Sequence, residues 1–332
     1  MPLHDISYKH WQGTHLGVWD RRAAIAKNGL GACLQNRWMW NLVVLCWGVG
    51  LVAAALLFLV GQLLVPDSMV VGWVSKFNPT VQTFTALLTG WLANHPEISV
   101  GATQNVLFYY LCSWLQRVGI FALGVAIPGL ITRDLACNAI VIYSSKAVSR
   151  GDYLLGKFAT AFGFLTLVWL GPVCAAWFLG NLLSPDWSFF WHARGALGNI
   201  LIYGVTSMAI LSTLALGVSA IGLKEKSTTA VWFMWWILGG VIGPIALHTK
   251  PWLRHLSFNF DLDQLALATF RVSDNLKTAE DALPILTTIL ENNGRSRFVA
   301  SLDTPNLAGT WLALLAMLGL AAWIIRKRVK PE

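Results

Sequence analysis

Six apolar stretches, each long enough to cross a lipid bilayer, constrain this chain more than any other feature. They cover residues 41–65, 106–131, 158–183, 196–221, 229–248 and 306–325. A helix rises 1.5 Å per residue, so about 20 apolar residues span the roughly 30 Å of hydrocarbon in a bilayer. Five stretches contain no Asp, Glu, Lys or Arg, and the second contains only Arg117. Because they are continuously apolar and do not alternate with a period of two, they predict an all-α membrane protein with six transmembrane helices.

The basic residues are distributed unequally between the segments that connect the predicted spans. When these segments are assigned alternately to two sides, one side carries fifteen Lys or Arg residues. The other side carries eight, against ten acidic residues, and six of the eight lie in one long segment, 249–305. Since Lys and Arg are enriched in cytoplasmic loops, the pattern predicts that both termini are cytoplasmic. The same distribution accounts for the net charge of +8 without a nucleic-acid partner.

Residues 1–40 precede the first predicted span and form a basic lead-in containing several Trp residues. From Gly17 onward, apolar residues recur at helical spacing: Trp19, Ala23, Ala26, Leu30 and Leu34. Arg21, Arg22 and Lys27 lie elsewhere around the same helical wheel. This pattern predicts an amphipathic helix in the inner-leaflet interface, with a disordered basic tail as the alternative.

The segment 249–305 lies on the outer side in this topology and is mixed in charge. Its stretches 262–270 and 282–290 each predict a short amphipathic helix. Near the end of the fifth span lie four residues of types that bind metals: His248, His255, Asp261 and Asp263. Their spacing fits no known ligand pattern, so we interpret them as polar residues of the membrane interface.

One stretch is a near match to a cofactor motif. Residues 151–158 have the spacing of a phosphate-binding loop, but Phe158 replaces the Ser or Thr that would hold Mg²⁺. Bulky residues, including Tyr153, would also crowd a loop that must wrap phosphate closely. The five cysteines show no CxxC spacing. We therefore expect the chain itself to bind no ATP, metal or other cofactor, and to have no enzymatic activity of its own.

The segment 132–157 connects the second and third predicted spans on the cytoplasmic side and has the pattern of a compact hairpin. It begins with the adjacent Arg133 and Asp134 and turns near Ser149. Ser149 is suited to cap the next helix, and Asp152 lies in its first turn, where a helix N-terminus favours negative charge. One interpretation of this segment is a plain structural turn.

The other interpretation is a docking element for a second protein. Apolar residues in the middle of the hairpin, including Tyr143 and Val148, are framed by the basic Lys146 and Arg150. An apolar centre with a charged rim is how small protein interfaces are commonly built.

Three sequence patterns lie in and beside this hairpin. They are Gly129-Leu-Ile-x-Arg133-Asp-Leu, Tyr143-x-Ser145-Lys146 and Ser149-Arg-x-Asp-Tyr-Leu-Leu-Gly-Lys157. In them the chain resembles the permease subunits of ABC exporters, which have six spans each. The first eight residues, the Trp- and Gly-rich lead-in and the outer stretch from Trp252 to Asp263 resemble one bacterial branch of that family. The similarity thus covers essentially the whole chain.

The resemblance implies that the hairpin is the coupling element that sits on a separate ATPase subunit. The residues that it assigns to this role are Arg133, Asp134, Tyr143, Lys146, Val148, Arg150 and Asp152. It also implies a transporter of two permease subunits, identical or homologous, and two ATPase subunits that bind ATP and Mg²⁺, in a bacterial inner membrane. The chain departs from the family at Ala147, where Pro is usual, and at Arg117, where a large apolar residue is usual.

Arg117 is the one charged residue within the predicted spans. It precedes Arg133 by sixteen residues, about 24 Å along a helix, which predicts a position in the outer part of the second span. The favoured interpretation is a side chain that reaches the outer headgroups. The alternative is a residue of the substrate path, because an intramembrane charge costs about 3 kcal/mol or more and usually has a function.

Three classes of function are compatible with a chain of this kind. The first is a permease subunit driven by an ATPase through the hairpin. The second is a membrane scaffold or force transmitter that uses the same ATPase to act on a periplasmic partner through 249–305. The third, an ion-coupled carrier or intramembrane enzyme, needs buried acidic or His residues in the spans, and the sequence has there only His248, at the last position of the fifth.

Overall fold

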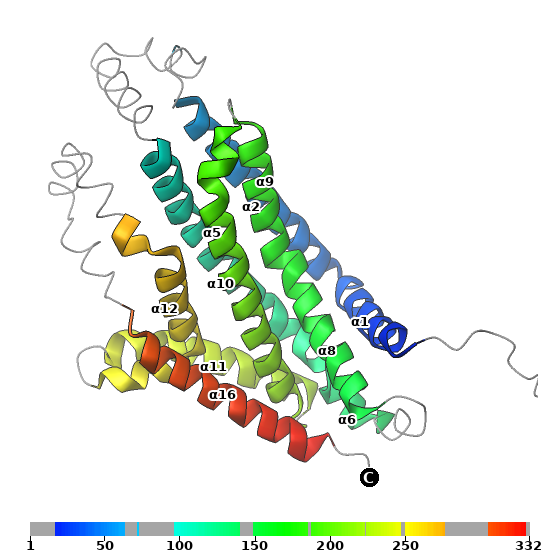
Figure 1. The fold of residues 1–332 in the computed structure, drawn as a ribbon. Coiled ribbons are helices and arrows are strands. Elements are labelled where there is room, and N and C mark those ends of the chain that lie inside the picture. The colour runs from blue at the N-terminus through cyan, green and yellow to red at the C-terminus, as the bar shows by residue number, and fades with distance from the viewer. Residues whose placement is uncertain are drawn as a thin grey trace, which may run out of the picture.

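The computed structural model describes residues 17–63, 72, 96–139, 149–184, 187–222, 224–246, 250–275 and 305–329. Within them every regular element is a helix, which confirms the predicted all-α class. Four long helical segments run side by side in Figure 1: α2 (Arg37–Leu63), α5 (Pro96–Ala126), the continuous pair α8 (Arg150–Leu165) and α9 (Gly171–Leu182), and α10 (Ser188–Ser219). Their packing buries one apolar core.

The other elements surround this bundle. They are α1 (Val18–Leu34), η1 (Ile127–Gly129), α6 (Thr132–Ala136), α11 (Glu225–Ala246), η3 (Pro251–Leu256), α12 (Phe258–Phe270) and α16 (Leu307–Arg328). In Figure 1, α1 lies along α8 at the end of the bundle that also holds α6 and the C-terminal end of α16.

Five helical segments are long and apolar enough to cross a membrane. They are Arg37–Gln62, Val100–Ala136, Arg150–Leu182, Phe189–Ser219 and Leu307–Arg328. These segments contain most or all of five of the six predicted spans, and three of them begin well before the apolar run because the helices continue through flanking polar turns. The remaining predicted span, 229–248, falls largely within α11, which is helical over 22 residues but is not among the five.

The break between α8 and α9 follows from Pro172. Proline donates no backbone hydrogen bond and its ring crowds the preceding turn, so a helix usually bends or bulges there. Residues Thr166–Leu170 adopt a π-helical turn just before it. The carbonyl of Leu167 in this turn accepts a hydrogen bond from Trp47 Nε1 of α2 at 3.1 Å. The bulge therefore also fixes α2 against this helix pair.

The segment α12 lies inside the bundle. It packs against α5, α10, α11 and α16, and its Leu262, Ala266 and Phe270 are fully buried. Phe258, at its start, packs on Trp232 and Trp235 of α11, while Phe270, at its end, contacts Tyr109 of α5. The sequence prediction of a helix at 262–270 is confirmed. This helix packs against apolar partners on several sides; the second expected helix, 282–290, lies outside the described residues.

The helix α1 confirms the predicted lead-in helix. It begins after Gly17, whose backbone N–H donates to Asp20 Oδ2 at 3.0 Å. None of its residues is fully buried, so it is held by one face only, which packs on α8. At this contact a Cβ on Gly156 would lie only 2.7 Å from Ile25 Cβ, so the absence of a side chain is what lets the two helices approach.

Candidate functional site

The site that the sequence points to is the base of the hairpin 132–157, at the charged end of the bundle. The chain leaves α5 through η1 and turns into α6 beside the last turn of α10. The backbone N–H groups of Ile131 and Thr132 both donate to Ser219 Oγ, at 2.9 and 3.0 Å, and the Thr132 hydroxyl donates to the Ser219 carbonyl at 2.9 Å. All these groups are buried, so the N-terminal end of the hairpin is fixed to the end of α10.

Asp134 closes the base of the hairpin. Its carboxylate pairs with Lys157 Nζ at 2.8 Å and accepts a hydrogen bond from the Tyr153 hydroxyl at 2.7 Å. Both charged side chains are less than one-fifth exposed, so the pair is shielded from solvent. Residues 151–158 are part of α8, and Lys157 also reaches the Gly129 carbonyl. Lys157, the lysine of the sequence pattern that nearly matches a phosphate-binding loop, therefore joins the two ends of the hairpin.

Asp152 attaches α1 to α8. The Asp152 backbone N–H donates to Ser149 Oγ at 3.1 Å, which confirms Ser149 as the N-cap of α8. The Asp152 carboxylate accepts from Ser149 Oγ at 2.6 Å and pairs with Arg22 Nε of α1 at 2.6 Å. The Asp152 side chain is 7% exposed, so both interactions are largely desolvated.

The two arginines of the described hairpin contact other helices. Arg133 forms a two-pronged ion pair with Glu225 in the first turn of α11, at 2.9 and 3.1 Å. The hydrogen bonds from Arg133 lower the pKa of the Glu225 carboxyl. Arg150 Nη2 donates to the carbonyls of Ile325 and Arg326, at 3.1 and 2.9 Å, and so caps the C-terminal end of α16.

Four of the seven predicted coupling residues are thus described, and each binds a different helix. Arg133 holds α11, Asp134 holds α8, Arg150 holds α16 and Asp152 holds α1. The other three, Tyr143, Lys146 and Val148, lie outside the described residues. The sequence analysis did not predict which residues these four side chains contact. One signal was available: Glu225 is the one acidic residue in a basic connection assigned to the same side as Arg133.

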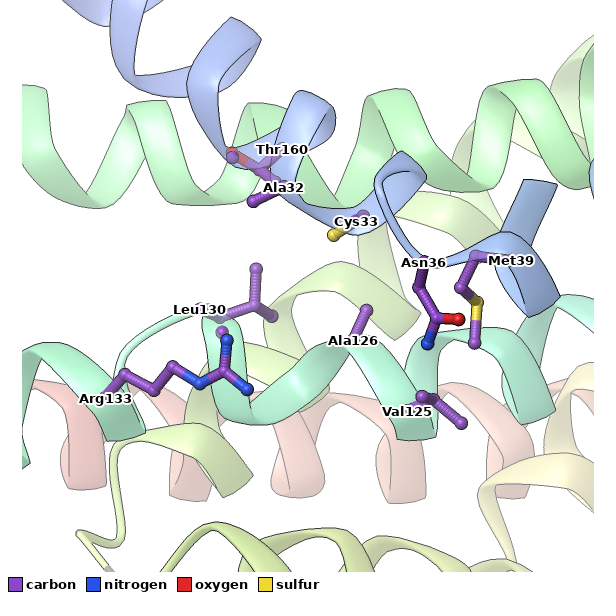
Figure 2. Close-up of a pocket in the computed structure, with 11 residues that line it drawn as sticks. Ala32, Cys33, Asn36, Met39, Val125, Ala126, Leu130, Arg133 and Thr160 are labelled. Atoms are coloured by element: carbon purple, nitrogen blue, oxygen red, sulfur yellow. The ribbon is translucent and has the colours of Figure 1, made fainter.

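A cavity of about 170 Å³ lies between α1 and the end of α5 (Figure 2). Arg133 and Leu130 line it on one side and Cys33 on the other, with Asn36 nearby. Burial raises the pKa of the Cys33 thiol, although the positive charges of Lys157 and Arg133 oppose this shift. The Cys33 thiol is therefore less readily ionised than an exposed cysteine. The cavity is a partly polar gap between α1 and the bundle.

Arg117 lies near the middle of the candidate span Val100–Ala136, nine residues before the end of α5. The helix α5 begins as early as Pro96, ten residues before the predicted span, and the predicted position of Arg117 in the outer part of the membrane stays a prediction. Its guanidinium pairs with Asp263 of α12 at 3.6 Å. Asp263 was interpreted as an interfacial residue, and only the inward position of α12 brings it to the arginine. The Arg117 side chain is 47% exposed, so one side of it remains accessible.

His255 and Asp261 form a second pair on the opposite side of α12. His255 Nδ1 lies 2.6 Å from Asp261 Oδ1, and the Asp261 side chain is fully buried. Among the described residues, no group of three His, Cys, Asp or Glu side chains is placed to hold a metal ion.

No family model matches the sequence, and no curated protein matches it.

Proposed function

We propose that this chain is the membrane-spanning permease subunit of an ATP-driven ABC exporter. In this proposal two permease subunits, identical or homologous, work with two separate ATPase subunits, which bind ATP and Mg²⁺. The hairpin 132–157 is the element on which the ATPase acts. The proposal is supported by the hairpin motifs and by five helical segments long and apolar enough to cross a bilayer.

The observation that carries the proposal is the set of contacts at the base of the hairpin. Four hairpin residues each contact a different helix: Arg133 contacts α11, Asp134 contacts α8, Arg150 contacts α16 and Asp152 contacts α1. A displacement of the hairpin would therefore act on four helices at once. A plain turn needs only the contacts that close it. A coupling element needs contacts that pass its movement to the helices, and this is the arrangement here.

We further propose six spans, with α11 as the fifth, and both termini on the cytoplasmic side of a bacterial inner membrane. The start of α11, the start of α8 and the end of α16 are joined at one end of the bundle by Arg133 and Arg150. The basic residues Arg326, Lys327 and Arg328 lie at the same end. This concentration of positive charge supports a cytoplasmic assignment for that end.

The first test measures how tightly the hairpin binds the ATPase subunit. Tyr143→Ala should cost about 2 kcal/mol of docking, roughly a thirtyfold loss of affinity, because large aromatic residues dominate small interfaces. Lys146→Ala should cost less, and mainly at low salt. The measurement is the amount of ATPase subunit that co-purifies with the tagged full chain in mild detergent, at equal permease levels.

Tyr143→Phe is the matched control and should retain the ATPase, because it keeps the ring. If Tyr143→Ala and Lys146→Ala both bind the ATPase as well as the unchanged chain, the hairpin is only a turn. If the complex forms but its ATP hydrolysis in proteoliposomes responds to no transported compound, the alternative of a force transmitter acting on a periplasmic partner is favoured.

The second test concerns Arg117 as a residue of the substrate path. The half-exposed guanidinium, already paired with Asp263, is available to an anionic group from its open side. Arg117→Leu should then lower transport while expression and basal ATP hydrolysis persist. Arg117→Lys keeps the charge and should retain much of the transport. Loss of expression in Arg117→Leu, rescued by Asp263→Leu, would instead make the pair structural.

A further inference from the structure

A second cavity, of about 550 Å³, lies between η3 and the N-terminal half of α16. Its size falls within the range of small-molecule sites in proteins. Most of its wall is apolar and includes Leu256 of η3 and Leu312, Ala313 and Met317 of α16. Two polar residues, His255 and Asn306, also line it. The cavity therefore suits an amphiphilic ligand, because it is an apolar trough with polar side chains at one end.

The polar end presents two nitrogen atoms. Asn306 Oδ1 accepts the Gly309 backbone N–H at 3.2 Å as the N-cap of α16, which leaves its Nδ2 free to donate elsewhere. His255 Nδ1 is taken by Asp261, which leaves Nε2 on the other side of the ring. A Cβ on Gly309 would lie 3.0 Å from both Asn306 Nδ2 and His255 Nε2. The two nitrogens therefore face the same small space, within about 6 Å of each other.

The charges around this end favour an anion. Lys250 and Arg254 flank His255 in and beside η3, and the N-terminal end of α16 contributes its positive dipole end. His255 Nδ1 shares a hydrogen bond with the fully buried Asp261 side chain, so Nε2 is the ring nitrogen left for a ligand.

The chain does not satisfy all the buried polar atoms in this region by itself. Thr310 Oγ1 follows Gly309 in α16 and Asp261 Oδ2 lies behind His255, and both are buried without a hydrogen-bond partner in the described part of the chain. Buried polar atoms in folded proteins nearly always have a partner from protein, water or ligand. Asp261 and Thr310 do not line the cavity, so these two atoms lie behind its wall and do not identify its occupant.

We propose that this cavity binds an anionic phospholipid of the bilayer. Its phosphate accepts from Asn306 Nδ2 and His255 Nε2, and one acyl chain lies along α16 against Leu312 and Ala313. The occupant is a bilayer lipid because the trough opens on the apolar outer face of a candidate span, where Leu312 is 73% exposed. Trp252 at the rim is 63% exposed, as is usual for a residue at headgroup level. The proposal does not depend on the transport function.

The test is lipid binding by the full chain in mild detergent, measured by native mass spectrometry. Dioleoyl-phosphatidylglycerol and dioleoyl-phosphatidylcholine are the probes, and they differ only in headgroup. The decisive variant is Gly309→Ala, whose methyl group would contact both nitrogens and shield them from the phosphate. Gly319→Ala is its matched control, because it makes the same change in α16 at a position with no neighbour within 4 Å. Asn306→Asp is a second variant, since aspartate still caps a helix but replaces the N–H donor by a negative charge.

We expect the unchanged chain and Gly319→Ala to bind phosphatidylglycerol about tenfold more tightly than phosphatidylcholine, as one charge-assisted hydrogen bond provides. Gly309→Ala and Asn306→Asp should lose this preference. Equal binding of the two lipids by the unchanged chain would overturn the proposal, as would a preference that survives in both variants. Displacement of phosphatidylglycerol by a lower concentration of oleate would overturn the assignment to a bilayer lipid in favour of a free fatty acid.

Discussion

The base of the hairpin and the helix α12 both join several helices through charged residues, but they do so in different ways. At the hairpin base the contacts are many and differ in exposure: the Arg133–Glu225 pair is at least half exposed on both sides, whereas the Asp134–Lys157 pair is less than one-fifth exposed. On α12 there are two pairs among apolar partners, and Asp261 is fully buried. The cost of losing an ion pair is set largely by how much water can reach the charge that is left behind.

This difference has a consequence for function. Water can replace the exposed Arg133–Glu225 contact, so this pair can break and re-form at little cost, which suits a region that must move under the action of a partner. The buried His255–Asp261 pair has no such replacement, so it holds α12 in one position against η3. We therefore expect the three pairs below to differ in their contribution to stability, in the order of their burial.

The largest effect is expected at α12. His255→Leu leaves the fully buried Asp261 without its partner, which should cost about 3–5 kcal/mol. In mild detergent the apparent melting temperature should fall by about 10 °C or more. The double variant His255→Leu with Asp261→Leu should recover most of the loss, because replacing a whole buried pair by apolar residues is often neutral. If His255→Leu melts like the unchanged chain, the α12 pair is not the rigid element that we describe.

An intermediate effect is expected at the contact between α1 and α8. Asp152→Ala removes the ion pair to Arg22 and a hydrogen bond from Ser149, so α1 should separate from α8 more often. With Cys33 as the one cysteine in the chain, its labelling by a maleimide should rise about tenfold, as expected for one charge-assisted hydrogen bond. Asp20→Ala is the matched control, since Asp20 is exposed and contacts only its own helix. An equal rise in Cys33 labelling in Asp20→Ala would show that the opening of α1 does not depend on the Asp152 contacts.

The smallest effect is expected for the exposed pair of Arg133 and Glu225. Glu225→Gln should change the melting temperature much less than Asp152→Ala, and the change should vanish in high salt. The pKa of Glu225 is lowered in the folded chain, so its contribution is present above the ordinary glutamate pKa of about 4.3 and is lost as the pH falls through the lower folded value. Melting curves of both proteins between pH 3 and 6 should therefore converge at the acidic end. A large fall in melting temperature that does not depend on salt would show that this pair is as important for stability as the pairs of α12.

Much of the fold could be predicted because it depends on local patterns. Long apolar runs define helices wherever they occur, and the cap at Ser149 depends on residues three positions apart. The partners of the hairpin residues could not be predicted, because Arg22 and Asp152 are 130 residues apart in the sequence. The same holds for Arg117 and Asp263, whose pairing requires α12 to fold back into the bundle.

From the sequence alone, the chain is predicted to be helical with six membrane spans, and its basic residues are predicted to concentrate on one side; the structure shows five candidate spans in the described residues. These properties follow from composition and spacing, which act within one helix. The contacts of the hairpin residues with four different helices, and the pairing of Asp261 and Asp263 with His255 and Arg117, came from the tertiary structure alone. Such contacts depend on which helix faces pack together, and side-chain packing and the need to compensate buried charge select that arrangement over the whole chain at once.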